Sequence, residues 1–383
     1  MKRIIQFTIF LMLLFLTVYA MDEASLIDEY TQIYGAKIAE GLENADINSV
    51  APSFNVEGLL SDLNQGKNIF SVSGILSGLL GLFLGELKTT VRLLMIIPII
   101  AVINIYINGM HQSFQTKGAT RAAFTVCYTV MAGVAATAFL QAVSGGRAVV
   151  ENVSVFMRVL VPVVLTSLAS GGAVISATTL EVVLMTIIEI THLAVEKLFI
   201  PMTMAGAALN VVNNISDSLN TEKLVGLLNS TVRWGMGIML TLFVGIVGIQ
   251  GIATGSVDGL AVKVTRFATS NLVPMVGGIL AETVETVMNC SVVIKNSVGV
   301  VGIISVILVS VTPILKIAAC LVVFRICAAL IQPISDIKCV TCIGSLADST
   351  ASILAMCVAV VVLFIILLTI MLNIGNSAVM LGR

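Results

Sequence analysis

Long stretches with few charged residues are the feature that most constrains how this chain can fold. Several of them run for about 18 or more residues, which is enough for an α-helix to cross a hydrocarbon core of roughly 30 Å. Across the chain 58% of the residues are apolar, only 11% are charged and the mean hydropathy is +1.08. These values lie far from those of an ordinary globular domain. The sequence therefore predicts an all-α, polytopic helical membrane protein.

The apolar stretches predict about six or seven transmembrane helices in the mature chain. The expected spans are 93–108, 119–143, 159–180, 182–209, 234–253, 298–324 and 351–373. Pro201 is expected to kink or break the span at 182–209, and Pro313 interrupts the span at 298–324. The shorter stretch 72–84 contains GILSG and GLFLG, two spacings of small residues that let helices approach closely, and it is either re-entrant or spanning. The helix count stays open at 72–84 and at Pro201.

Residues 1–20 have the pattern of a secretory signal peptide. Two basic residues precede the apolar stretch 4–16, and Ala20 supplies a small residue for cleavage. An uncleaved membrane anchor is the alternative, and either one places residues 21–70 outside the cytoplasm. Segment 21–70 carries nine acidic and two basic residues, a net charge of −7. It is too short to bury a substantial core of its own.

The rest of the chain divides into three parts by charge pattern. A first transmembrane bundle is expected at 71–256, an amphipathic interfacial segment at 257–297 and C-terminal transmembrane helices at 298–383. In the interfacial segment charged residues return every few positions and apolar residues form stripes at helical spacing, which suits a membrane surface. The residues expected to dock there are Lys263, Arg266, Glu282 and Glu285.

Glu189, His192 and Glu196 form an unusual polar cluster because they lie inside an apolar helix. Their spacing of i, i+3 and i+7 places them on one helical face. Ionisable groups at membrane depth are costly, so such a face marks a pore lining, a proton site or a partner contact. The plainer interpretation is that Glu196 and Lys197 lie at the membrane interface and that Glu189 bonds to a neighbouring helix. A metal site is a third interpretation. It is disfavoured because the chain has only two histidines to serve as ligands.

Lys316 and Arg325 flank the apolar run 317–324. They are expected either to extend toward the lipid headgroups or to form the charged edge of a helix that breaks near Pro313.

The seven cysteines do not predict a disulfide framework, because their number is odd and none lies in segment 21–70. Cys339 and Cys342 form a C-x-x-C pair, but no second pair and no nearby histidine accompanies them. This favours a packing role over a redox or metal role.

The motifs that are missing from the sequence narrow the class of function. The string nearest to a phosphate-binding loop, DLNQGKNIF at 62–70, lacks both the first glycine and the Ser/Thr of that motif. H-E-x-x-H and G-x-S-x-G do not occur, and no block of basic residues suggests nucleic acid. We therefore expect no enzymatic activity, no cofactor and no nucleic-acid partner, with any energy supplied by another protein.

Several strings are recognisable as those of a known family. They are NLVPMVGGILAETVETVMNCSVVIKNSVGVVGI at 271–303, ALIQPISD at 329–336, TIMLNIGNSAVMLGR at 369–383, LNVVNNISDSLNTEKLVGLLNS at 209–230 and VGIQG at 247–251. Together they resemble the stage III sporulation protein AE family of endospore-forming bacteria.

This resemblance implies a multi-pass protein of the mother-cell membrane that surrounds the forespore. It further implies a component of a secretion-like channel that joins the two compartments. The implied partners are other proteins of the same operon, including a cytoplasmic ATPase and a ring-forming protein, and a forespore channel protein across the intermembrane space. The family offers no established catalytic residues to transfer to this sequence.

Three functional hypotheses remain open from the sequence: a structural or conducting core of such a channel, an autonomous solute permease, and an assembly scaffold without a pore. Orientation is also open. The count of basic residues favours a cytoplasmic loop at 109–121, but Arg147, Arg158 and Arg325 compete for the other side.

Overall fold

The computed structural model describes residues 72–111, 117–213, 221–272 and 277–382, and within these ranges it contains helices and no strand. The expected signal peptide and the acidic segment at 21–70 lie outside the described residues. The helices are α4 (Val72–Leu94), α5 (Ile96–His111), α6 (Lys117–Ser170), α7 (Val174–Ala194), the π-helical turn η2 (Val195–Phe199), α8 (Ile200–Asn213), α9 (Glu222–Leu272), α10 (Gly277–Ile331) and α11 (Ile337–Gly382). The all-α prediction is confirmed for this part of the chain.

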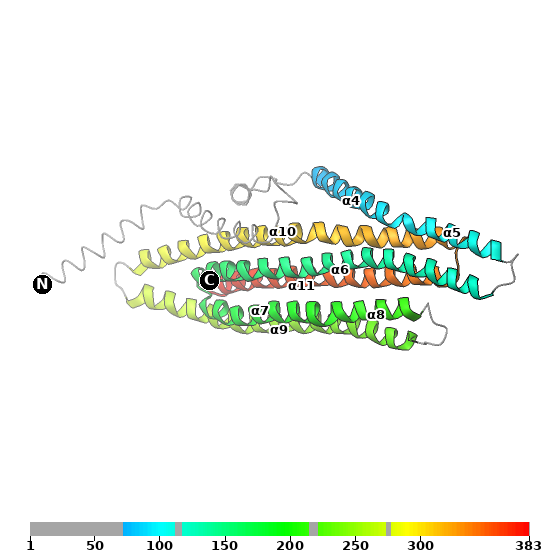
Figure 1. Cartoon of the computed structure of the whole chain (residues 1–383). Helices are drawn as coiled ribbons and strands as arrows, with labels where there is room; N and C mark the ends of the chain where they lie inside the picture. Colours follow the sequence, from blue (N-terminus) through cyan, green and yellow to red (C-terminus); the bar gives the residue numbers. More distant parts are fainter. Residues whose placement is uncertain (1–71, 112–116, 214–220, 273–276, 383) are drawn as a thin grey trace.

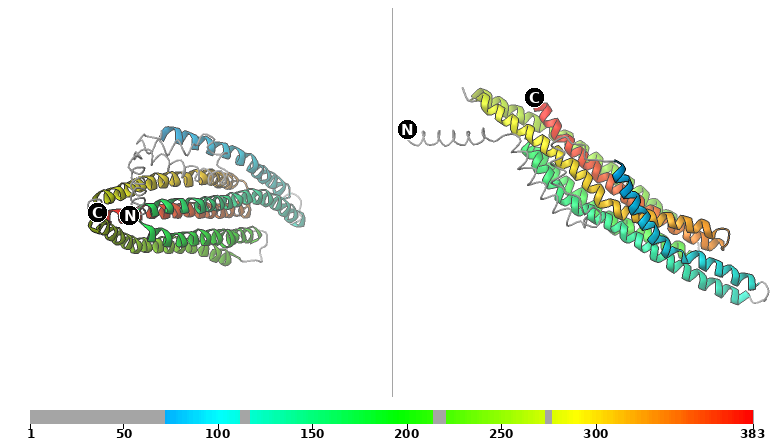
Figure 2. Two further views of the ribbon diagram at one scale, coloured as in Figure 1. Left: turned by 90° about the vertical axis from the view of Figure 1, so that its left-hand side faces the viewer. Right: turned by 90° about the horizontal axis from the view of Figure 1, so that it is seen from above.

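The helices form one elongated bundle in which successive long helices run antiparallel (Figures 1 and 2). Helix α11 lies in the centre, in contact with α6, α8, α9 and α10, while α4 packs along α10 and α5 along α6. Helices α6 and α10 contain 54 and 55 residues. At a rise of about 1.5 Å per residue each is roughly 80 Å long. This is far more than the roughly 30 Å of a hydrocarbon core.

Five segments among the described residues are long and apolar enough to cross a membrane. They are Phe124–Ser170, Val174–Asn213, Glu222–Ala261, Ser291–Ile331 and Ile337–Ile374. The prediction of a multi-helix membrane protein is thus confirmed at the level of class, while the count of six or seven spans stays a prediction.

The position of the turn between α6 and α7 differs from the sequence prediction. Two separate spans were expected at 119–143 and 159–180, but α6 continues as one helix from Lys117 to Ser170. The chain reverses at Gly171 and Gly172 instead, inside the second expected span. Gly172 has a φ of 91°, a left-handed conformation that glycine adopts without the steric cost of a Cβ atom. The boundaries predicted for the span at 159–180 were therefore wrong, while 119–143 lies within α6.

The expected irregularity near Pro201 takes the form of the π-helical turn η2. Pro201 has no backbone N–H, so the carbonyl of Lys197 cannot receive its usual α-helical hydrogen bond. The turn that precedes Pro201 widens, and the N–H of Ile200 bonds to the carbonyl of Val195, five residues earlier. The helix direction then continues into α8. Helix α10 likewise continues through Pro313, so no broken helix forms there.

Glycines allow close contact between the central helices. A Cβ atom on Gly146 of α6 would lie 2.6 Å from Cγ2 of Ile353 on α11, and one on Gly302 of α10 would lie 2.6 Å from Cδ2 of Leu160 on α6. Gly251 meets Ile374 and Gly299 meets Leu372 in the same way. Small residues at such crossings let helix backbones approach each other.

We expect Gly146→Val to destabilise the bundle, because its side chain would overlap with Ile353. Overpacking of this kind costs about 1–3 kcal/mol. Gly133→Val is the matched control on the same helix, since nothing lies within 4 Å of a Cβ atom at Gly133. Thermal unfolding of both variants in detergent measures the difference. Equal unfolding temperatures would contradict the close packing at Gly146.

Candidate functional site

One segment of α6 with three charged residues lies beside the most apolar parts of two other helices. The thiol of Cys357 on α11 contacts the carbonyl of Gly146 at 3.7 Å, and Leu160 packs at Gly302 of α10. Between these two crossings α6 carries Arg147, Glu151 and Arg158. The neighbouring parts of α10 and α11, at 298–315 and 351–373, contain no acidic or basic residue. The charged segment of α6 therefore lies level with the uncharged parts of two helices that are long and apolar enough to cross a membrane.

The same reasoning applies to α7 and η2. At one end, Asp258 of α9 accepts hydrogen bonds from backbone N–H groups of α7, and at the other end Phe199 packs against Gly235 of α9. The part of α9 between these contacts, 234–257, has no ionisable residue. Glu189, His192, Glu196 and Lys197 therefore lie level with the uncharged part of α9.

Seven charged or ionisable residues of α6, α7 and η2 lie along the contact between α6 and α7. We call this set the charged band. Its members are Arg147, Glu151, Arg158, Glu189, His192, Glu196 and Lys197.

Short polar contacts connect the charged band internally. Nη2 of Arg158 donates to Oε2 of Glu189 at 2.8 Å. Nε2 of His192 lies 3.0 Å from Oε2 of Glu196 and 3.4 Å from Oε2 of Glu151, and Nζ of Lys197 lies 2.9 Å from Oε1 of Glu196.

The charged band is open toward the outside of the bundle. Side chains of Glu151 and Glu189 are 52% and 53% exposed, whereas that of His192 is only 12% exposed. Lipid cannot solvate such groups, and each charged residue at the centre of a membrane helix costs about 2.5–3.5 kcal/mol on insertion scales. A surface of this kind at membrane depth needs protein or water to cover it.

Glu189, His192 and Glu196 lie on the side of α7 and η2 that adjoins α6. Glu189 bonds to Arg158 of that helix, as the plainer interpretation expected, while the role of this face stays a prediction. Sequence reasoning missed its partners Glu151 and Arg158. The sequence did contain a signal for them. Arg147, Glu151 and Arg158 are spaced four and seven residues apart, which places them on one face of a helix.

Lys316 and Arg325 of α10 lie outside the charged band and have acidic neighbours. Nζ of Lys316 is 3.7 Å from Oε1 of Glu86 on α4, and Nη2 of Arg325 is 2.6 Å from Oδ1 of Asp348 on α11. Both pairs join neighbouring helices. The expected edge of a broken helix does not form, because α10 is continuous from Gly277 to Ile331.

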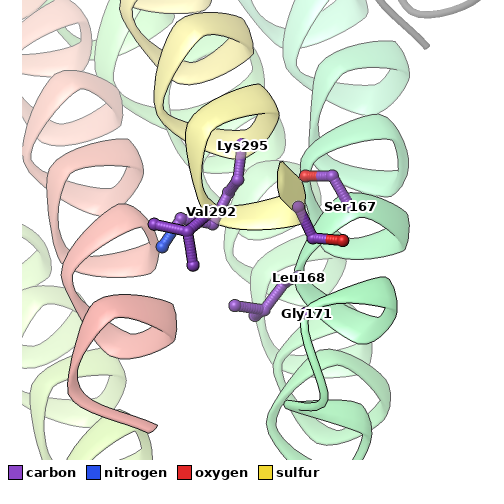
Figure 3. Close-up of a pocket in the computed structure, with 6 residues that line it drawn as sticks. Ser167, Leu168, Gly171, Val292 and Lys295 are labelled. Carbon is purple, nitrogen blue, oxygen red and sulfur yellow. The ribbon is translucent and has the colours of Figure 1, made fainter. Parts of the chain in front are cut away.

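A small crevice of about 160 Å³ lies between α6 and α10 (Figure 3). Lys295 is only 1% exposed there, and its Nζ donates a hydrogen bond to the carbonyl of Leu372 on α11 at 2.6 Å. The lining residues are Ser167, Leu168, Gly171, Ser291, Val292 and Lys295. The crevice is shallow and encloses no space for a water-sized molecule, so we assign it no ligand.

The residues expected to dock at a membrane surface lie on helices that continue past the predicted boundaries. Helix α9 runs through residue 257 to Leu272, and α10 begins at Gly277 and runs through 297. Lys263 is exposed. The side chains of Arg266, Glu282 and Glu285 lie outside the described residues. Their docking role stays a prediction.

The described cysteines are buried or half-buried and free of disulfides. Thiols of Cys320 and Cys327 contact the carbonyls of Ala138 and Leu94 on other helices, at 3.5 and 3.8 Å. Cys339 and Cys342 are buried within α11. These contacts agree with the packing role expected from the sequence.

Comparison with known proteins adds an identification to this geometry. The family model described as stage III sporulation protein AE matches residues 54–375. The chain belongs to the stage III sporulation protein AE family. It is 24% identical over 325 residues to the stage III sporulation protein AE of Bacillus subtilis (strain 168), an alignment that covers 85% of this chain and 82% of that protein. No solved structure matches it.

Asp258 of α9 is a buried carboxylate that sequence analysis did not single out. It is 1% exposed, and its Oδ1 and Oδ2 accept hydrogen bonds from the N–H groups of Ile175 and Ser176, at 3.0 and 2.9 Å. These N–H groups belong to the first turn of α7, where a helix has free donors and a partial positive charge. Asp258 therefore caps α7 from another helix.

We expect Asp258→Asn to destabilise the bundle by about 1–3 kcal/mol, because the amide nitrogen cannot accept the second hydrogen bond. Asp348→Asn is the control, since Asp348 forms an ion pair with both side chains more than half exposed. Loss of such a pair costs about 0–1 kcal/mol. Thermal unfolding measures both. A larger effect at Asp348 than at Asp258 would contradict the capping role.

Proposed function

We propose that this chain is a membrane component of a secretion-like channel that links mother cell and forespore, and that it lies in the mother-cell membrane around the forespore. Membership of a stage III sporulation family supports the cellular process. The observation that carries the proposal is the charged band, an exposed polar surface at membrane depth on an otherwise apolar bundle.

The charged band favours an assembly over a lone chain. It combines three acidic and three basic side chains with His192, so it is polar without a large net charge. Hydrocarbon leaves the exposed groups of this surface without hydrogen-bond partners. A second protein, another copy of this chain or a water-filled path would supply those partners.

The length of the helices also suits an assembly. A bundle roughly 80 Å long leaves a large part of α6 and α10 outside a roughly 30 Å hydrocarbon core. We propose that this part contacts the other proteins of the same operon. A cytoplasmic ATPase would supply energy, a ring-forming protein would extend the path, and a forespore channel protein would complete it.

An autonomous permease is less well supported by the described residues. The crevice at Lys295 is small, and neither α7 nor α10 is broken at membrane depth, as transporter binding sites often require. A scaffold without a pore remains the main alternative. In that case no solute would pass through the complete assembly, whereas a channel would conduct one.

Association is the first outcome that the proposal predicts. We expect the protein to co-purify in mild detergent with the ATPase and ring-forming protein of its operon, and we expect deletion of its gene to block sporulation. Extraction as a lone monomer, together with normal sporulation in its absence, would exclude a channel role.

Conduction is the second outcome. The assembled complex, reconstituted in vesicles, should release a small solute, and the double variant Arg158→Gln, Glu189→Gln should change the rate several-fold. The double change removes one ion pair of the charged band while preserving net charge, and both positions keep a polar side chain. Lys316→Gln with Glu86→Gln is the control, because that pair lies outside the charged band. A fully assembled complex that releases no solute would favour the scaffold.

A further inference from the structure

We propose that Glu151, His192 and Glu196 form a binding site for a divalent transition-metal ion. The three side chains come from two helices, Glu151 from α6 and the other two from α7 and η2. One ligand atom from each lies within 4.8 Å of the other two. The site is independent of the proposed channel and uses the centre of the charged band.

Two of the three distances between ligand atoms match the spacing of ligands around one small cation. Nε2 of His192 lies 3.0 Å from Oε2 of Glu196 and 3.4 Å from Oε2 of Glu151. With metal–ligand bonds of about 2.0–2.1 Å, adjacent ligands are about 2.9 Å apart in an octahedral site and about 3.3 Å apart in a tetrahedral one. Ligand atoms of the two carboxylates lie within 4.8 Å of each other, so an ion between them would draw in the half-exposed side chain of Glu151.

The donor set selects the class of metal. One imidazole nitrogen with two carboxylate oxygens suits Zn²⁺, Mn²⁺ or Fe²⁺, whereas Ca²⁺ and Mg²⁺ prefer oxygen donors alone and Cu⁺ prefers thiolates. Two carboxylates also balance the charge of one divalent ion. The occupied site is thus close to neutral, which lowers the cost of placing it at membrane depth.

The surroundings determine which atoms are available for binding. Nζ of Lys197 lies 2.9 Å from Oε1 of Glu196, which leaves Oε2 directed toward His192. The imidazole of His192 is 12% exposed, and its Nδ1 is buried without a hydrogen-bond partner, so Nε2 is its binding atom. Glu151 is half-exposed, and its side of the site is open for water as a further ligand.

The π-helical turn supports the arrangement. Glu196 and Lys197 both lie in η2, where the widened backbone changes the direction of side chains relative to a regular α-helix. Turns of this type occur often at functional sites. A bound ion would connect α6 to α7 at the place where the α-helical pattern is interrupted.

The test uses the protein in mild detergent, stripped of metal with a chelator and titrated with Co²⁺, whose visible absorption reports its ligands. We expect one Co²⁺ per chain, with absorption typical of nitrogen and oxygen ligands, displacement by Zn²⁺ and a higher unfolding temperature. Glu151→Gln, His192→Asn and Glu196→Gln should each weaken binding at least tenfold.

Two controls separate this site from other binding. Glu189→Gln changes a charged residue of the same helix that lies outside the cluster, and it should bind Co²⁺ like the parent. Cys339→Ser with Cys342→Ser should also leave binding unchanged, since thiolates would give a distinct absorption. The metal-free variants are checked for folding by thermal unfolding. No Co²⁺ binding by the parent, or equal binding by the three ligand variants, would overturn the proposal.

Discussion

Hydrocarbon offers no hydrogen-bond partners, and most of the arrangement of this bundle follows from that condition. A charged group buried among apolar helices is costly unless another part of the chain pairs with it. Asp258 is paired with free N–H groups of α7, and Lys295 is paired with a carbonyl of α11. Buried thiols contact carbonyls of neighbouring helices in the same way. These contacts join helices that are distant in sequence, so pairing the polar groups also fixes the packing.

The charged band satisfies the same condition only in part. Its ion pairs connect α6 to α7, yet Glu151 and Glu189 remain about half exposed. A buried pair that loses one partner leaves an uncompensated charge, which costs several kcal/mol. Contact of the exposed side chains with lipid is therefore unfavourable, and the proposed assembly would supply the cover that they lack. Asp258 and Lys295, both almost completely buried, place no such requirement on a partner.

Much of the fold was predictable because apolar length is a property of the sequence itself. The helical class and the apolar cores of α9, α10 and α11 follow from the stretches at 234–253, 298–324 and 351–373. The limits of α6 did not follow. Charged residues between 147 and 158 resemble a loop between two spans, but they lie within one continuous helix, and Glu151 and Arg158 pair with residues of α7. The actual turn depends on Gly172, whose positive φ is visible only in the folded chain.

The candidate site illustrates a more general limit. Helical periodicity placed Glu189, His192 and Glu196 on one face, because a single helix determines that relation. It could not find Glu151 or Arg158, because their relation to α7 depends on how two helices pack. The same limit applies to the three arginines that leave the orientation open in the sequence. Arg158 and Arg325 lie inside helices with acidic partners, and Arg147 lies within α6. The charged band could have been predicted by pairing the ionisable residues of one apolar helix with those of another. Periodicity along a single helix does not make that comparison.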